Sequence, residues 1–187
     1  LSVPVLFYNK DTFRKAKLDP NKPPATWWQV QETAGKIYDV DRRCPFTSSN
    51  PAWVLMENVA TQHGEPLAHG ENSGKSGLAL NNLVEVKHVA LLASWHKSFY
   101  FRTFGPGREA DGKFMSGECS MLTSDSSLYL QLLRRKPFDF GVAALPHYDD
   151  VRGAAPGRVL PDGAVLWALA GKKKPEYAAT ARFVAFL

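Results

Sequence analysis

Serine hydroxyls are the first candidates for chemistry, but the sequence gives none of them a partner. The candidates are Ser2, Ser124, Ser126 and Ser127. No G-x-S-x-G motif is present, and no histidine or carboxylate can be assigned to any of these serines as a base. His147, beside Tyr148 and Asp149, is the candidate base for an α/β hydrolase or transferase. An exposed loop after Pro146 explains these residues without chemistry, so we do not expect an enzyme.

Two further patterns suggest a phosphate site and a metal site. Gly74-Lys75-Ser76 matches the end of a phosphate-binding loop, but the glycine required five places earlier is His69, and no strand leads into the loop. His63 and His69 flank a loop at residues 64–77 with no cysteine or paired carboxylate at ligand spacing. We therefore expect neither site, and we expect solvent-exposed histidines.

A strand-to-helix junction lies at Asn50. Residues 44–48 (CPFTS) are typical of a short strand, and Pro51 favours the first turn of a helix over residues 52–63. In α/β folds, ligand groups lie where a strand ends and a helix begins. Asn50 can offer hydrogen bonds at this junction.

A second junction lies at Asp125 and Ser126. We predict a strand over residues 118–123, followed by a polar turn and a helix that ends near Arg135. Hydroxyls and backbone amides at a helix N-terminus suit a polar or anionic ligand. Capping of the helix explains Asp125 and Ser126 equally well.

The remaining elements must position these junctions, and they alternate between strands and helices. We predict strands over residues 3–8, 140–145 and 162–167, and helices over residues 11–17, 26–38 and 82–97, with a last helix opened by Pro175. Residues 146–156 read as an exposed loop. This pattern predicts an α/β fold.

Spacing predicts the buried faces of the two longest helices. Thr26 and Gln29 form the capping box of the first helix, whose buried face is expected to hold Trp27, Val30, Ala34 and Ile37. The buried face of the second is expected to hold Val86, Val89, Ala90 and Ala93. His88 and His96 then lie on its edges.

Composition excludes two classes of protein. The 187 residues are 44% hydrophobic, which is enough for one core, but no run approaches the roughly 20 apolar residues of a membrane span. The net charge of +5 comes from scattered lysines and arginines without aromatic stacking motifs, so nucleic-acid binding is not expected. Cys44 and Cys119 fit either two thiols or one disulfide.

Long segments resemble one family. Residues 4–27 of LSVPVLFYNKDTFRKAKLDPNKPPATW resemble PVLYYNKDxFKKAGLDPxxPPxTW of the periplasmic sn-glycerol-3-phosphate-binding protein family of ABC importers, extracellular solute-binding protein family 1. The segment FMSGECSMLTSDSS resembles KFYNGDCAMTTASSGS, and FGVAALP and GAVLWALAG resemble YGVGMMP and GGASLWVMQG. The chain begins directly in a strand, so we expect residue 1 to lie within a larger protein.

The resemblance implies a fold and a domain organisation. Residues 1–187 would form a single α/β lobe of the periplasmic-binding-protein type II, with three layers, helix–sheet–helix, around a mixed sheet. Residues 1–10 would be the strand nearest the hinge to a second lobe. Two such lobes close on a ligand.

The resemblance also implies a ligand-binding face. Carried over residue by residue, this face consists of Ser2, Asn50, Trp53, Asp125, Ser126, Asp162 and Gly163. Asn50 replaces the first tryptophan of the family's GWQGW segment. Asp125 and Asp162 replace small neutral residues, and a carboxylate near a phosphate costs roughly 1 to 4 kcal/mol. We therefore expect the intact protein to bind a glycerol-based or sugar-like polyol, and to bind simple glycerol-3-phosphate less tightly than typical relatives do.

The function implied is that of the solute-binding component of an ABC importer, which captures glycerol-3-phosphate or a related glycerophosphodiester or polyol. The alternative is a neutral sugar-binding protein of the same fold, and a less favoured alternative is an α/β hydrolase. The implied location is the periplasm, and the implied partners are a small solute and permease subunits. No cofactor, metal or nucleic acid is expected, and a monomer is expected.

The inferred oxidising compartment favours a disulfide between Cys44 and Cys119, which both stand at the start of predicted strands.

Overall fold

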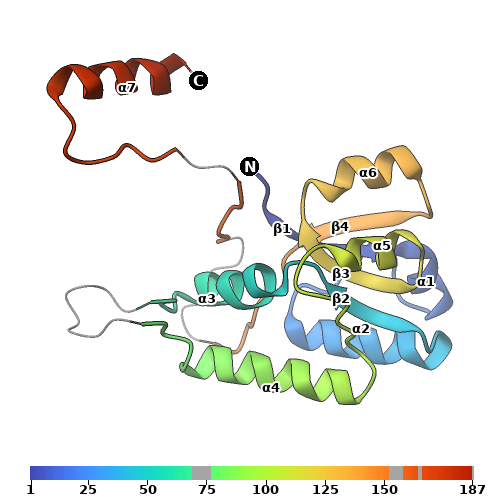
Figure 1. Ribbon diagram of the computed structural model, residues 1–187. Coiled ribbons are helices and arrows are strands. Elements are labelled where there is room, and N and C mark those ends of the chain that lie inside the picture. Colours follow the sequence, from blue (N-terminus) through green and yellow to red (C-terminus); the bar gives the residue numbers. More distant parts are fainter. Residues whose placement is uncertain (69–76, 152–157, 164–165, 187) are drawn as a thin grey trace.

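The computed structural model describes residues 1–68, 77–151, 158–163 and 166–186. Its centre is a four-stranded sheet of β1 (Pro4–Asn9), β2 (Cys44–Ser48), β3 (Cys119–Asp125) and β4 (Phe140–Ala144), in the order β2-β3-β1-β4 (Figure 1). β2 is parallel to β3, whereas β1 is antiparallel to both of its neighbours. The sheet is therefore mixed, as predicted.

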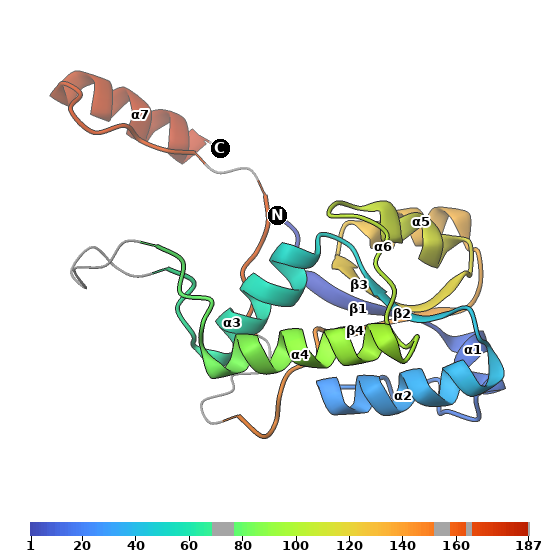
Figure 2. The same cartoon turned by 60° about the horizontal axis from the view of Figure 1, so that its bottom comes forward.

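Helices cover both faces of the sheet. They are α1 (Lys10–Lys15), α2 (Trp27–Val40), the π-helix η1 (Ala52–Glu57), α3 (Asn58–His63), α4 (Leu83–Lys97), α5 (Glu109–Met115), α6 (Leu128–Arg135) and α7 (Lys174–Phe186). Figures 1 and 2 show α2 and α4 on one face and α5 and α6 on the other. This confirms the predicted α/β class, with one layer of helices on either side of the sheet. The short helix α5 was not predicted.

Alternation along the strands supplies a core on each face, because successive side chains of a strand point to opposite sides. Leu6 and Tyr8 of β1 pack into the cluster that contains Trp27, whereas Phe7 packs into the cluster that contains Phe114. Each cluster is fully buried at its centre. The two cores fix β1 between the helical layers.

The buried face of α2 is the predicted one. Trp27, Val30, Ala34 and Ile37 are all 0% exposed. The side chain of Thr26 accepts a hydrogen bond from the Gln29 backbone N–H at 3.2 Å. Gln29 Oε1 accepts from the Ala25 N–H at 2.8 Å and not from the Thr26 N–H, so the reciprocal bond reaches one residue further back than in a standard capping box.

The predicted buried face of α4 is wrong. Val86 and Val89 are 52% and 48% exposed, and Ala90 and Ala93 are exposed as well. The helix instead buries Val84, Glu85, His88 and Trp95. His88 therefore lies in the core and not on an edge. Apolar residues occur all around this helix, so spacing alone could not select the face that packs against Trp27 and Tyr148.

Tyr148 anchors the segment after β4 in the core. Its hydroxyl lies 2.8 Å from His88 Nδ1, and its backbone N–H donates to His63 Nε2 at 3.1 Å. Tyr148 is 0% exposed and His63 is 5% exposed. The predictions of an exposed loop at this position and of an exposed His63 are therefore wrong. His69 lies outside the described residues.

Two titratable groups of α4 lack full hydrogen bonding. Both carboxylate oxygens of Glu85, and His88 Nε2, are buried without a partner in the described part of the chain. Burial, with a smaller contribution from Glu65, raises the pKa of Glu85 to about 7. Burial, with a smaller contribution from His63, lowers the pKa of His88 to about 3. Both groups therefore favour the neutral form, as expected for desolvated charges.

The region after residue 158 differs from the prediction. Of the strand expected over residues 162–167, the described residues form only an isolated bridge between Ser2 and Asp162. Residues 164 and 165 lie outside the described residues. α7 lies apart from the sheet and buries no residue (Figures 1 and 2). No helix in the described part of the chain combines the length and the apolar character needed to cross a bilayer.

A disulfide joins Cys44 and Cys119, the pair for which the sequence predicts one. The two residues are directly opposite each other in the parallel pair of β2 and β3, with their Cα atoms 4.4 Å apart. The bond links the first residues of both strands, and both strands then run toward the predicted site.

Candidate ligand-binding site

The candidate site lies at one end of the sheet. The carboxyl ends of β2 and β3 reach this end together with the beginning of β1, because β1 runs antiparallel to β3. An open depression of about 390 Å³ lies here, lined by Asn50, Ala52, Trp53, Glu57, Pro106 and Asp162. Three of the residues expected from the sequence, Asn50, Trp53 and Asp162, are therefore brought together.

Asn50 holds an unusual backbone conformation at the end of β2. Its φ of 46° lies in the left-handed region, which non-glycine residues adopt at a cost. The Asn50 N–H donates to the Gly107 carbonyl at 2.7 Å. The loop before α5 thus holds Asn50 in place and brings Pro106 to the wall of the depression.

Trp53 connects η1 to the segment that carries Asp162. Its Nε1–H donates to the Leu160 carbonyl at 3.1 Å, and the Leu160 N–H donates to Asn58 Oδ1 at 2.7 Å. Two hydrogen bonds therefore fix the backbone of Leu160 against the helix. Asp162, two residues later, lines the depression.

Ser2 and Gly163 flank Asp162. Ser2 and Asp162 exchange backbone hydrogen bonds, while the exposed Asp162 side chain accepts from the Gly163 N–H at 2.8 Å. A Cβ at Gly163 would stand 3.0 Å from Leu1 Cδ2. Ser2 and Gly163 therefore lie at the site, although they do not line the depression.

Ser126 pairs with the beginning of β1. Its N–H donates to the Val3 carbonyl at 2.8 Å, and its hydroxyl accepts from the Val3 N–H at 3.2 Å. The hydroxyl thus bonds the strand and lies outside the lining of the depression. Ser126 is therefore near the site, and its contacts are structural.

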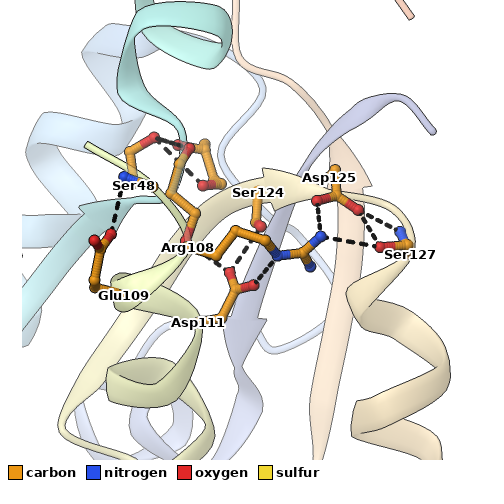
Figure 3. Close-up of polar contacts among 10 residues, drawn as sticks. Ser48, Arg108, Glu109, Asp111, Ser124, Asp125 and Ser127 are labelled. Carbon is orange, nitrogen blue, oxygen red and sulfur yellow. Dashed lines mark hydrogen bonds and ion pairs between the residues drawn. The ribbon is translucent and has the colours of Figure 1, made fainter. Parts of the chain in front are cut away.

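Asp125 is closed off from the depression. Its side chain is only 4% exposed, and it forms an ion pair of 2.6 Å with Arg108 (Figure 3). Its Oδ1 also accepts from the Ser127 N–H at 2.9 Å. The positive charge of Arg108 compensates the carboxylate that the sequence placed on the binding face.

Arg108 and Asp111 were not identified from the sequence. Figure 3 shows the Arg108 guanidinium between Asp111 and Asp125. Asp111 accepts from Arg108 Nε at 2.9 Å, from the Ser49 hydroxyl at 2.7 Å and from the Ser124 hydroxyl at 2.8 Å. The Gly-Pro-Gly sequence before Arg108 signals a turn. Arg108 and Asp111 stand three residues apart, a spacing that suits an ion pair, but no sequence pattern signals the pairing of Arg108 with Asp125 from a separate element.

The lining groups determine which ligands the depression can accept. Glu57 and Asp162 offer carboxylates, Asn50 an amide and Trp53 an indole, and no lysine or arginine is among the described lining residues. Carboxylates and amides bond hydroxyl groups well, and an indole face favours cations and apolar faces. No group of three metal-ligating side chains occurs in the described residues.

The hydrolase alternative gains no support from the structure. Backbone hydrogen bonds link His147 to Ala25 and Trp27, at 3.2 and 3.1 Å, so His147 borders the chain that enters α2. Within the described residues, no serine hydroxyl is hydrogen-bonded to a histidine. The hydroxyls of Ser49 and Ser124 bond Asp111, and that of Ser127 bonds Asp125. Arg108 compensates the charge of both carboxylates. A serine–histidine pair is therefore not assembled in this part of the chain.

Comparison with protein families gives a match over the whole chain. Residues 1–187 match the family described as bacterial extracellular solute-binding protein. The sn-glycerol-3-phosphate-binding periplasmic protein UgpB of Salmonella typhimurium is 36% identical over 190 aligned residues, and that of Pectobacterium atrosepticum is 37% identical. The alignments cover all of this chain but only 43% and 42% of those proteins. The chain thus spans less than half the length of these relatives.

Solved structures share the fold. UgpB from Mycobacterium tuberculosis in complex with glycerophosphocholine has a TM-score of 0.67 and 18% identity, covering 99% of this chain and 46% of that one. The cyclic alpha-maltosyl-1,6-maltose binding protein from Arthrobacter globiformis has a TM-score of 0.69 and 22% identity, covering 83% of this chain and 39% of that one.

Proposed function

The chain belongs to the family of bacterial extracellular solute-binding proteins, and we propose that the full-length protein is the solute-binding component of an ABC importer. In this proposal it captures a glycerol-based solute in the periplasm and delivers it to permease subunits. Its curated relatives are named as binding proteins for sn-glycerol-3-phosphate. This part of the chain would form one wall of the binding cleft.

One observation carries the proposal. The depression that holds Asn50, Trp53 and Asp162 lies beyond the carboxyl ends of β2 and β3, where α/β sheets bind ligands. Its open shape suits a site that a second lobe completes by closing over the ligand.

The charges of the site suggest which solute is preferred. Two carboxylates, from Glu57 and Asp162, line the depression without a described cation among the lining residues. Asp125 is paired with Arg108, so Glu57 and Asp162 account for the repulsion of an anion. A carboxylate about 4 Å from a phosphate costs roughly 1 kcal/mol in water and ~4 kcal/mol near a protein surface.

We therefore propose that a glycerophosphodiester with a cationic head group, or a neutral glycerol-based polyol, binds more tightly than glycerol-3-phosphate. A cationic head group gains from both carboxylates and from the indole of Trp53. Neutral sugars are the alternative ligands, because their hydroxyls suit the same groups.

Titration calorimetry on the full-length protein tests the proposal. The ligands are glycerophosphocholine, glycerol-3-phosphate, glycerol and maltose. We expect the first to bind at least tenfold more tightly than the second. Tight binding of maltose alone would favour the sugar-binding alternative. Turnover of ester or phosphoester substrates that is lost in His147→Ala would overturn the binding function altogether.

A further inference from the structure

We propose that Arg108 is a positioning residue for the candidate site, which fixes the loops at its base in the conformation that binds solute. The inference rests on the proposed function, because it assumes that the depression is the solute site. Arg108 is not among the residues that line the depression, so it acts on the solute through neighbouring residues and does not touch it.

Arg108 joins loops that follow two different strands. Its Nη1 donates to Asp125 Oδ2 at 2.6 Å and to the Ser127 hydroxyl at 3.3 Å, at the turn after β3. Its Nε donates to Asp111 at 2.9 Å. Asp111 in turn accepts from the hydroxyl of Ser49, the residue that follows β2. The guanidinium thus fastens the end of β3 to the loop before α5 directly, and it reaches the residue after β2 only through Asp111 (Figure 3).

The same loop holds Asn50 in its left-handed conformation. Gly107, the neighbour of Arg108, accepts the Asn50 N–H at 2.7 Å, and Pro106 lines the depression beside Asn50. Asparagine tolerates this conformation better than most residues, and the hydrogen bond to Gly107 is the contact that holds it here. Loosening Arg108 should therefore release Gly107, and with it the orientation of the Asn50 amide.

The chemistry of the contact requires arginine. Asp111 and Asp125 are 8% and 4% exposed in their side chains, so both carboxylates depend on a compensating charge. A planar guanidinium can bond two carboxylates through separate nitrogens in fixed directions. A lysine keeps the charge but offers a single ammonium, which cannot hold both groups in this geometry.

The test compares Arg108→Lys with a matched control in the full-length protein. Arg14 also bridges two carboxylates, Asp11 at 2.7 Å and Asp139 at 2.6 Å, near the opposite end of β1. Arg14→Lys is the control. Affinity for glycerophosphocholine is measured by calorimetry, at a temperature well below the thermal unfolding midpoint of each variant. Hydrogen exchange is followed at the Asn50 amide, with the Phe46 amide of β2, which bonds the Tyr100 carbonyl at 3.0 Å, as the internal reference.

We expect Arg108→Lys to bind solute at least tenfold more weakly than the wild type. Its Asn50 amide should exchange at least tenfold faster, whereas the Phe46 amide should exchange at the wild-type rate. Arg14→Lys should stay within twofold in both measurements. Equal affinity of Arg108→Lys and the wild type would overturn the inference. If the wild type does not bind glycerophosphocholine, the proposed solute is wrong, and hydrogen exchange alone tests the role of Arg108. Faster exchange at the Asn50 amide in Arg108→Lys then supports the positioning role, and unchanged exchange overturns it.

Arg108→Lys could fail to fold, because two buried carboxylates depend on it. Asp125→Asn then tests the contact from the other side, since it leaves the pair of Arg108 and Asp111 intact. Weaker binding with faster exchange at Asn50 supports the inference, and wild-type values for both overturn it.

Discussion

Ser2 and Asp162 exchange two backbone hydrogen bonds, each 2.9 Å from nitrogen to oxygen, although they lie near opposite ends of the chain. The pair extends β1 at the edge of the depression and presents the Asp162 carboxylate to it. Because the backbone fixes its position, the charge of Asp162 can be removed without removing the contact that holds it.

Asp162→Asn should strengthen binding of glycerol-3-phosphate to the full-length protein by roughly tenfold at low salt, since one repulsive charge near the phosphate is removed. The gain should shrink at high salt, because screening weakens interactions of exposed charges. Calorimetry at two salt concentrations measures both effects. Asp149→Asn, an exposed carboxylate outside the lining, is the control. Unaltered affinity in Asp162→Asn would show that this side chain faces solvent.

Reduction of the disulfide should destabilise the protein by about 4 kcal/mol, the chain-entropy value for a loop of this length. Cys44 and Cys119 are separated by 75 positions, so the closed loop is long. Urea unfolding with and without reductant measures the effect, and reductant should not affect a variant with alanine at both positions. Two free thiols in the unfolded, unreduced protein would contradict this prediction.

Glu85→Gln should change the dependence of stability on pH. Between pH 4.5, the ordinary pKa, and about 7, the folded state retains a proton on Glu85 that the unfolded state has lost. The protonated Glu85 therefore makes its whole contribution to the free energy of unfolding below pH 4.5. This contribution is lost as the pH rises to 7, by roughly 1.4 kcal/mol per pH unit at most. The free energy of unfolding of the variant relative to the wild type should rise across this window.

His88 contributes the opposite slope and provides a check. Its pKa falls from 6.5 to about 3, so the unfolded state binds a proton between these values that the folded state does not. Its contribution thus increases with pH up to 6.5 and offsets that of Glu85 from pH 4.5 to 6.5. Removing Glu85 leaves the contribution of His88 without this offset, so the stability of Glu85→Gln should rise with pH more steeply than that of the wild type. Glu32→Gln, exposed on α2, should run parallel to the wild type.

Gly141→Ala should destabilise the fold by roughly 2 kcal/mol or more, because an added methyl group would overlap the ring of Tyr8 on the neighbouring strand. Tyr8 cannot easily move, since it is buried and its hydroxyl donates to the Pro20 carbonyl at 3.0 Å. Gly112→Ala is the matched control. Nothing lies within 4 Å of a Cβ at Gly112, and it lies inside α5, so alanine should stabilise by about 0.5 to 1 kcal/mol. Urea unfolding of both variants tests the pair.

Strand patterns and helix caps predicted most of the fold. The strands β1 to β4 appear close to the expected positions, and Thr26 caps α2, because these features depend on residues near one another in sequence. The face of α4 could not be predicted. Its selection depends on Trp27 and Tyr148, which contact His88 from distant parts of the chain.

Only part of the site could be predicted, because its remaining contacts also depend on residues from distant parts of the chain. Asn50, Trp53 and Asp162 meet at one depression because the junction after β2 and the segment after residue 158 are positioned by the fold. The pairing of Asp125 with Arg108 depends on two side chains from separate elements, and spacing carries no information about it. The apolar run at residues 162–167 fits a strand by composition, yet composition cannot show whether a partner strand is present.

The sheet order has a consequence for folding during synthesis. Of the four strands, β1 and β2 precede the other two in the chain, but they are not neighbours, and each bonds directly to β3. No strand pair of the sheet can therefore form until residues 119–125 have left the ribosome, and β4 follows later still. Pairing between strands so far apart in sequence raises the contact order, and a higher contact order slows folding. Until then the apolar strand β1 remains unpaired in the nascent chain, where it is a natural binding segment for a chaperone.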